Sequence, residues 1–361
     1  MSAGQQPDSL SRLRERVGVR DVEREPSPRP SPASGRGGKA INPKYLPLAA
    51  TISLFFAMAT LGSVTYTGFF SLQVLLNLLI DNAFLIIGAV GMTFVILSGG
   101  IDLSVGSVIA LTTIVSASLV EKHGWSPALA VPLVLGMGTA FGAFMGFLIE
   151  RFRLQPFIVT LAGMFLARGL CYVISIDSIS IADPFYTSVS QLRIPVWGEA
   201  SISISAVIAI VVLLVAVFIA HCTPFGRAVY AVGGSESSAL LMGLPVRSTI
   251  IGVYTLSGFC SALAGVVFTF YMLSGYGLHA MGLELDAIAA VVIGGTLLTG
   301  GVGFVAGTLF GVLMLGIIQT LIAFDGTLSS WWTRIVVGAL LFVFCLLQRL
   351  FAARSHPKRL P

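Results

Sequence analysis

The stretch AVIAIVVLLVAVFIA (residues 206–220) contains no charged or hydrogen-bonding side chain. A second block of this kind runs from Ile335 to Leu347. With their flanking residues such blocks reach about 20 positions, the length at which an α-helix crosses the hydrocarbon core of a bilayer. The sequence therefore indicates helices that span a membrane.

The composition of the whole chain agrees with these blocks. Hydrophobic residues make up 56% of the 361 positions and charged residues 10%, whereas a soluble domain carries about 25% charged residues. The alternative is a large soluble protein with buried helices, but helices of that kind still carry polar faces. We therefore predict an all-α polytopic membrane protein.

Apolar segments follow one another from 45 to 350 and predict about ten transmembrane helices. The second segment is over-long and polar in the middle, so we expect it to be broken or steeply tilted. The eighth segment is short, and a re-entrant hairpin there would change the count. The predicted spans are 46–66, 72–98, 104–120, 127–149, 156–175, 202–221, 249–273, 285–298, 302–324 and 331–350.

Positive charges are concentrated at the two ends of the chain. Residues 1–44 hold nine Lys and Arg and the last thirteen residues hold four, so thirteen of the 21 basic residues lie in the tails. Basic flanks stay on the cytoplasmic side of a membrane, which predicts that both termini are cytoplasmic. Because the basic residues are not gathered as a patch on a fold, they do not indicate a nucleic-acid partner.

These features divide the chain into three parts. Residues 1–44 include PSPRPSPASGRGG (26–38), and a segment rich in Pro, Ser, Gly and Arg predicts a disordered cytoplasmic tail. Residues 45–350 form the predicted transmembrane domain, with an inner loop at 222–248. Residues 351–361 form a second cytoplasmic tail.

A conspicuous motif, SGGIDLSVGS, occupies residues 98–107 between two predicted spans. An acidic residue at a helix N-terminus complements the helix dipole and accepts from free N–H groups, so we expect Asp102 to cap the following helix. A direct role in the transport path is the alternative. The segment 97–101 also resembles 298–302, since both read small-Gly-Gly-aliphatic, which suggests an internal repeat. The motif-loop candidates are Gly99, Gly100, Asp102, Ser104 and Gly106.

The inner loop 222–248 reads as two short helices. Thr223 followed by Pro224 is typical of a helix start, with Gly233 as the stop, and Ser235 begins a second helix that ends at Gly243. Helices this short need a surface to pack against. We expect the loop to dock on a cytoplasmic partner through Leu240, Leu241 and Met242, and the alternative is an amphipathic segment lying on lipid.

Polar residues inside the predicted spans are costly in hydrocarbon and usually face a cavity or a partner. We expect Arg168 to pair with one of the acids. Only Asp81 lies clearly near the middle of a span, which argues against an ion-coupled transporter. The substrate-path candidates are Asn77, Asp81, Asn82, Ser98, Thr160, Arg168, Glu284, Asp286 and Thr296, and Gln319 is a further polar residue at membrane depth.

No catalytic or metal-binding pattern occurs in the sequence. It lacks GxxxxGK[ST], HExxH and GxSxG, and its four cysteines form no CxxC pair. We therefore predict no catalytic residue, no metal ligand, no cofactor bound by this chain and no ATP site of its own. A membrane enzyme or a purely structural membrane protein remains a distant alternative.

Three stretches carry a family resemblance: GMTFVILSGGIDLSVGSV (91–108), PFGRAVYAVGGSESSALLMGLPV (224–246) and ELDAIAAVVIGGTLLTGGVGFVAGTLFGV (284–312). They resemble the permease subunits of ribose/galactose-type bacterial ABC importers, and the resemblance covers nearly all of 45–350. Residues 81–110 and FDGTLSSWWT (324–333) are similar to the galactofuranose permeases of enteric bacteria. The tail before Asn42 departs from that pattern.

The resemblance implies a ten-span importer permease in the bacterial inner membrane that moves a sugar by alternating access. It implies a second, related permease subunit, a periplasmic sugar-binding protein, and a cytoplasmic ATPase whose two fused nucleotide-binding modules bind ATP and Mg²⁺. The same fold also serves permeases for pentoses, autoinducers and branched-chain amino acids. The loop residues that match the ATPase-coupling region are Pro224, Phe225, Gly226, Arg227, Gly233, Gly234, Ser235, Glu236, Met242 and Gly243.

Overall fold

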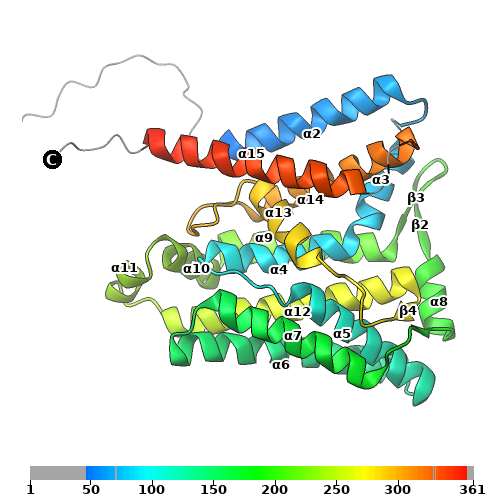
Figure 1. The fold of residues 1–361 in the computed structure, drawn as a ribbon, viewed down its shortest axis with the longest axis horizontal. Helices are drawn as coiled ribbons and strands as arrows, with labels where there is room; N and C mark the ends of the chain where they lie inside the picture. Colours follow the sequence, from blue (N-terminus) through cyan, green and yellow to red (C-terminus); the bar gives the residue numbers. More distant parts are fainter. Residues whose placement is uncertain (1–45, 70, 328, 330, 356–361) are drawn as a thin grey trace, which may run out of the picture. The chain divides into compact units, whose positions relative to one another are not determined.

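The computed structural model describes residues 46–69, 71–327, 329 and 331–355, and helices account for most of them. The predicted tail 1–44 and residues 356–361 lie outside the described residues. The α-helices are α2 (Leu46–Thr65), α3 (Leu72–Asp81), α4 (Ala83–Leu97), α5 (Val105–Ala117), α6 (Pro127–Phe152), α7 (Pro156–Ile174), α8 (Pro184–Gln191), α9 (Ile204–Cys222), α10 (Pro224–Gly234), α11 (Glu236–Leu241), α12 (Val246–Met272), α13 (Leu283–Ile293), α14 (Val305–Asp325) and α15 (Trp331–Ser355) (Figure 1).

The count of ten spans is not confirmed. Among the described residues, seven helices are long and apolar enough to cross a membrane, or eight if α3 and α4 form one span. The predicted eighth span contains only the 11-residue helix α13, which is too short to cross a bilayer of about 30 Å. The apolar part of α15 is the shorter stretch Trp331–Leu347, although α15 itself continues to Ser355, past the predicted boundary at 350.

The second predicted span is broken, as its polar residues indicated. Helices α3 and α4 meet at an angle of 57°. Asn82 lies at the break with φ −108° and ψ 11°, which is neither helical nor extended, and its Nδ2 donates to the carbonyl of Leu78 at 2.9 Å. The side-chain amide therefore satisfies a carbonyl at the end of α3, where a helix leaves such groups without partners.

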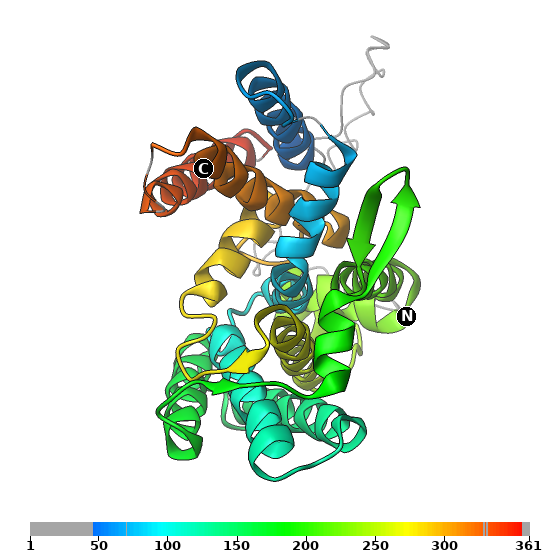
Figure 2. The ribbon, with the colours of Figure 1, turned by 90° about the vertical axis from the view of Figure 1, so that its right-hand side faces the viewer.

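The prediction of an all-α chain needs one correction. Two small antiparallel sheets lie at the end of the helices opposite α10 and α11 (Figure 1). Strand β1 (Ile179–Ser180) pairs with β4 (Ser274–Gly275), and β2 (Arg193–Trp197) pairs with β3 (Ala200–Ser203) (Figure 2). The strands are too short to show the alternation of apolar and polar residues that predicts a β-strand from sequence.

Helix α12 packs against α4, α5 and α6. A Cβ added to Gly142 of α6 would lie 2.9 Å from the Cα of Gly258 in α12, and one added to Gly138 would meet Ala262. Because no hydrophobic force draws helices together in lipid, small residues that allow close backbone approach stabilise such a pair. Gly138 and Gly142 therefore allow α6 and α12 to approach closely, whereas a Cβ on Gly136 of the same helix would meet nothing within 4 Å.

Candidate functional site

The loop between α9 and α12 folds as the two predicted helices. Thr223 Oγ1 accepts from the N–H of Gly226 at 3.2 Å at the start of α10, and Ser235 Oγ accepts from the N–H of Ser238 at 3.3 Å at the start of α11. Two boundaries differ: α10 continues through Gly234, and α11 ends at Leu241. Gly243 then adopts φ +75°, a left-handed conformation that glycine takes without steric cost.

One face of this loop packs on the bundle and the other is free. Val229 and Val232 of α10 are buried. The hydroxyl of Tyr230 donates to the carbonyl of Gly303 at 3.0 Å, and burial raises the pKa of Tyr230 to about 12, which keeps it a donor. On α11, Leu241 is 89% exposed, and Leu240 and Met242 are exposed with it. An exposed apolar cluster of this kind marks an interaction surface.

Three glycine pairs meet at the C-terminal end of α10. We call them the glycine junction: Gly99–Gly100, Gly233–Gly234 and Gly300–Gly301. The N–H of Gly301 donates to the carbonyl of Leu97 at 2.9 Å. A Cβ on Gly233 would overlap that same carbonyl, and a Cβ on Gly300 would lie 2.8 Å from the nitrogen of Gly99. The two sequence-similar turns, 97–101 and 298–302, therefore touch each other and the end of α10. Figure 1 shows α10 beside the end of α4, where the first of these turns begins.

Asp102 lies just beyond the first of these turns and is 1% exposed. Its Oδ1 accepts from the N–H and the hydroxyl of Ser104 at 2.9 and 2.6 Å, and its Oδ2 accepts from the hydroxyl of Ser257 at 2.7 Å. Burial raises the pKa of this carboxyl, and the bonds from Ser104 and Ser257 lower it. The predicted helix cap is wrong in its geometry, because the carboxylate closes a local turn and reaches α12 instead of the first free N–H groups of α5.

The other motif and path residues contact neighbouring elements. Ser98 lines a cavity of about 250 Å³ between the motif loop, the end of α6 and α11. The carboxylate of Glu284 lies against Gly106, where a side chain would collide with it. Thr160 Oγ1 donates to the carbonyl of Pro156 at 2.9 Å, and Thr296 is buried.

Asn77 and Asp81 on α3 bond to neighbouring side chains. The amide of Gln73 donates to Asn77 Oδ1 at 2.8 Å, and the hydroxyl of Tyr271 reaches Asp81 Oδ1 at 3.5 Å. Together with Asn82 at the helix break, these residues lie on the α3–α4 segment, whereas Thr160 lies on α7 and Thr296 follows α13.

The expected pairing of Arg168 with an acid is wrong. Its Nη1 donates to the carbonyls of Gly277 and His279 at 2.7 Å each, so this guanidinium holds the loop before α13 against α7. Of the acids named as path candidates, Asp286 forms an ion pair, with Arg334 Nη1 at 2.8 Å from its Oδ1.

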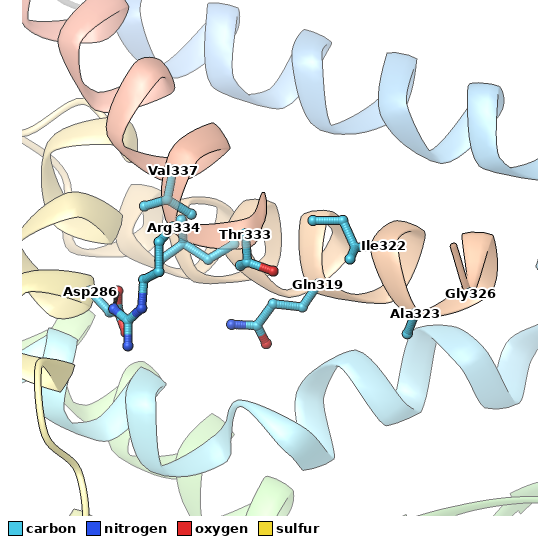
Figure 3. Close-up of a pocket in the computed structure, with 9 residues that line it drawn as sticks. Asp286, Gln319, Ile322, Ala323, Gly326, Thr333, Arg334 and Val337 are labelled. Atoms are coloured by element: carbon cyan, nitrogen blue, oxygen red, sulfur yellow. Dashed lines mark hydrogen bonds and ion pairs between the residues drawn. The ribbon is translucent and has the colours of Figure 1, made fainter. Parts of the chain in front are cut away.

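The Asp286–Arg334 pair lines a cavity of about 490 Å³ between α13, α14 and α15, together with Gln319 and Thr333 (Figure 3). Sequence reasoning missed Arg334 and Thr333 as members of a site. Arg334 was visible as a lone charge in the first turn of the last apolar segment, but nothing local indicated that Asp286, far earlier in the chain, would face it. The described residues contain no group of three or more His, Cys, Asp or Glu that could hold a metal ion.

Membrane-length helices, the glycine junction and one loop with an exposed apolar tip describe a helical protein that spans a membrane several times. A family model described as "Branched-chain amino acid transport system / permease component" matches residues 74–345. The chain belongs to this permease family.

Curated relatives support the same assignment. The chain is 55% identical over 306 residues to the inner membrane ABC transporter permease protein YjfF of Escherichia coli K12, a match that covers 85% of this chain and 92% of the relative. It is 39% identical to the fructose import permease protein FruG of Bifidobacterium longum, with 89% and 96% covered, and 37% identical to the ribose import permease protein RbsC of E. coli K12, with 83% and 92% covered. No solved structure matches the chain.

This protein is therefore a multi-pass permease subunit of an inner-membrane ABC transporter and not an enzyme. A permease of this family works with an ATPase and a substrate-binding partner.

Proposed function

We propose that this chain forms the membrane path of an ABC importer for a monosaccharide, with galactofuranose as the leading cargo. The observation that carries the cargo class is the similarity, over more than four fifths of the chain, to permeases named for fructose and ribose import. The choice of galactofuranose rests on the resemblance of residues 81–110 and 324–333 to the galactofuranose permeases of enteric bacteria.

The partners follow from the same proposal. A periplasmic sugar-binding protein delivers the cargo, and a second, related permease subunit completes the path. A cytoplasmic ATPase with two fused nucleotide-binding modules binds ATP and Mg²⁺, while this chain binds neither. The exposed side chains of Leu240, Leu241 and Met242 are the surface that receives the ATPase, because their burial in a complex would remove apolar area from water.

Alternating access is the mechanism that the contacts of α10 support. The glycine junction joins α10 by backbone contact to the C-terminal end of α4 and to the turn that precedes α14. Backbone contacts of this kind leave no flexible side chain to absorb a displacement. A movement of α11 by the ATPase would therefore reach both turns at once and tilt the helices attached to them.

Uptake by the reconstituted complex tests the cargo. Proteoliposomes that contain this chain, the second permease and the ATPase receive the binding protein outside and ATP inside, and labelled galactofuranose, galactose, ribose, fructose and leucine are compared. We expect ATP-dependent uptake of a sugar and none of leucine, without a requirement for a sodium or proton gradient. Uptake of leucine, or of no sugar, contradicts the proposal.

A further inference from the structure

The cavity between α13, α14 and α15 is lined by polar side chains that the packing of these helices does not require. We propose that it is a binding subsite for a neutral monosaccharide at the end of the path opposite α10 and α11. This inference rests on the proposed function and adds the site at which the sugar is held.

The cavity has the size and the mixed lining of a sugar site. Its volume is about 490 Å³, within the roughly 300–1,000 Å³ of small-molecule sites. Asp286, Arg334, Gln319 and Thr333 supply polar groups, and Ile322 and Val337 supply apolar ones. A pyranose or furanose ring presents hydroxyl groups at its edge and C–H groups on its face, so it needs both kinds of wall.

Gln319 is the residue that packing does not explain. It lies in the 21-residue apolar helix α14, its side chain is exposed, and its amide makes no hydrogen bond to any described residue. Figure 3 shows the amide extending from α14 into the space that also holds Thr333 and the ion pair. A bare amide against lipid is costly, so it faces water or a ligand. Because an amide both donates and accepts, it suits a hydroxyl, which does the same.

The charges in the cavity favour a neutral ligand. Asp286 and Arg334 lie 2.8 Å apart and neutralise each other. An anionic or zwitterionic ligand would have to separate this pair, whereas a polyol can bond to the free lone pairs and N–H groups that the pair leaves. The geometry therefore selects a sugar over a sugar phosphate or an amino acid.

The cavity lies near the ends of α14 and α15 that meet at Gly326, the end of the chain's helices opposite α11. With α11 on the cytoplasmic side, this end faces the binding protein. A sugar released there would meet Gln319 and Thr333 before it reaches the core of the bundle.

Two substitutions and one control test the subsite in the reconstituted complex, with labelled D-galactose and D-ribose as probes. Gln319→Leu removes the amide from a helix that tolerates leucine, and Ala323→Trp fills the cavity. Thr320→Val is the matched control, because the hydroxyl of Thr320 already donates to the carbonyl of Gly316 in its own helix at 2.9 Å. We expect Gln319→Leu to lower uptake about three- to tenfold, the effect of one or two lost hydrogen bonds, Ala323→Trp to abolish uptake, and Thr320→Val to retain it.

ATPase activity stimulated by the loaded binding protein separates a blocked path from a misfolded one, and we expect it to persist in Gln319→Leu. As a second measurement, a cysteine at Ala323 should react with a membrane-impermeant maleimide, and the transported sugar should slow the reaction. Wild-type uptake in Gln319→Leu and Ala323→Trp, or labelling at Ala323→Cys that sugar does not slow, overturns the subsite alone. If the wild-type complex takes up no sugar, the proposed function fails first and the subsite with it.

Discussion

The buried carboxylate of Asp102 joins the motif loop to α12. It accepts three hydrogen bonds from two serine residues, and one of these, Ser257, belongs to α12. A buried charge is stable only when its lone pairs are satisfied. The residue therefore acts as a clamp between the motif loop and α12.

Substitution of the clamp should lower stability in a set order. Ser257→Ala leaves Oδ2 of a buried carboxylate without its donor, which costs about 1.5–3 kcal/mol for a bond to a charged group. Asp102→Ala should cost at least as much, because it leaves the groups of both serine residues unpaired. Asp102→Asn should be milder, since its amide can donate to the Ser257 hydroxyl. Thermal unfolding of the purified complex in detergent measures the order, and a stable Ser257→Ala variant would show that this bond contributes nothing.

For two charged residues, Asp102 and Arg168, the contacts in the structure differ from those that the sequence predicted, and they involve residues far along the chain. Asp102 was expected to cap α5, and Arg168 was expected to pair with an acid. In the structure Arg168 bonds to two backbone carbonyls, and Asp286 takes Arg334. The charge of a buried side chain predicts that it has a partner. Which group is the partner depends on the segments that the tertiary structure brings beside it.

At the scale of elements, the two-helix loop is the part of the site that sequence predicted best. Its caps are local signals: a serine or threonine oxygen bonds to an N–H three residues later, and such bonds form whatever surrounds them. The glycine junction is the opposite case. The similarity of 97–101 to 298–302 was visible, but their contact with Gly233 was not, because it joins segments that are far apart in the chain.

Gly233 and Gly234 form a matched pair for testing the junction. A Cβ on Gly233 would overlap the carbonyl of Leu97, whereas a Cβ on Gly234 meets nothing within 4 Å. Gly233→Ala should therefore displace α10 and uncouple ATP hydrolysis from uptake, with normal insertion in the membrane. Gly234→Ala should retain coupling. The measurement is the ratio of sugar transported to ATP hydrolysed, and equal ratios in the two variants would remove the junction from the coupling mechanism.

A substitution at Gly243 should affect coupling less than Gly233→Ala does. This residue has φ +75° but nothing within 4 Å of a Cβ, so a larger residue there meets only local backbone strain, on the order of 1 kcal/mol.

The exposed tip of α11 leads to a separate expectation. Leu241→Glu should weaken co-purification of the ATPase, because it places a charge where an apolar side chain is 89% exposed for docking. Ser237→Glu adds the same charge to the same helix without removing apolar area, and it should retain the ATPase. Equal retention by both variants would mean that the partner binds elsewhere.

At the scale of the whole molecule, the orientation of the helices in the membrane decides which side α10 and α11 face. The positive-inside rule predicts that α10 and α11 are cytoplasmic. Among the described residues, seven helices, or eight if α3 and α4 form one span, are long and apolar enough to cross a membrane. Hydropathy finds apolar segments, but it does not separate a full span from α13, which is short and packs against α4 and α14 inside the bundle.

Cysteine labelling in intact cells and inverted vesicles tests the orientation. Cys222 is exposed next to α10, whereas Cys171 and Cys260 are buried. An impermeant maleimide should label Cys222 only in inverted vesicles. In a Cys222→Ser background, Glu199→Cys in the exposed β2–β3 turn should react only in intact cells. The reverse pattern would place α10 and α11 outside and exclude the proposed ATPase docking.

Hydropathy and local patterns predicted the membrane class, most of the long helices, a break or a steep tilt in the second span, and the caps of α10 and α11. These follow from hydropathy and from hydrogen bonds within a few residues, which are local properties of the chain. Three features appear only in the folded structure: the glycine pairs meet, Asp102 reaches Ser257, and Arg334 joins Asp286 beside Gln319. Each of these depends on the close approach of segments separated by tens to hundreds of residues, and no local pattern records that approach.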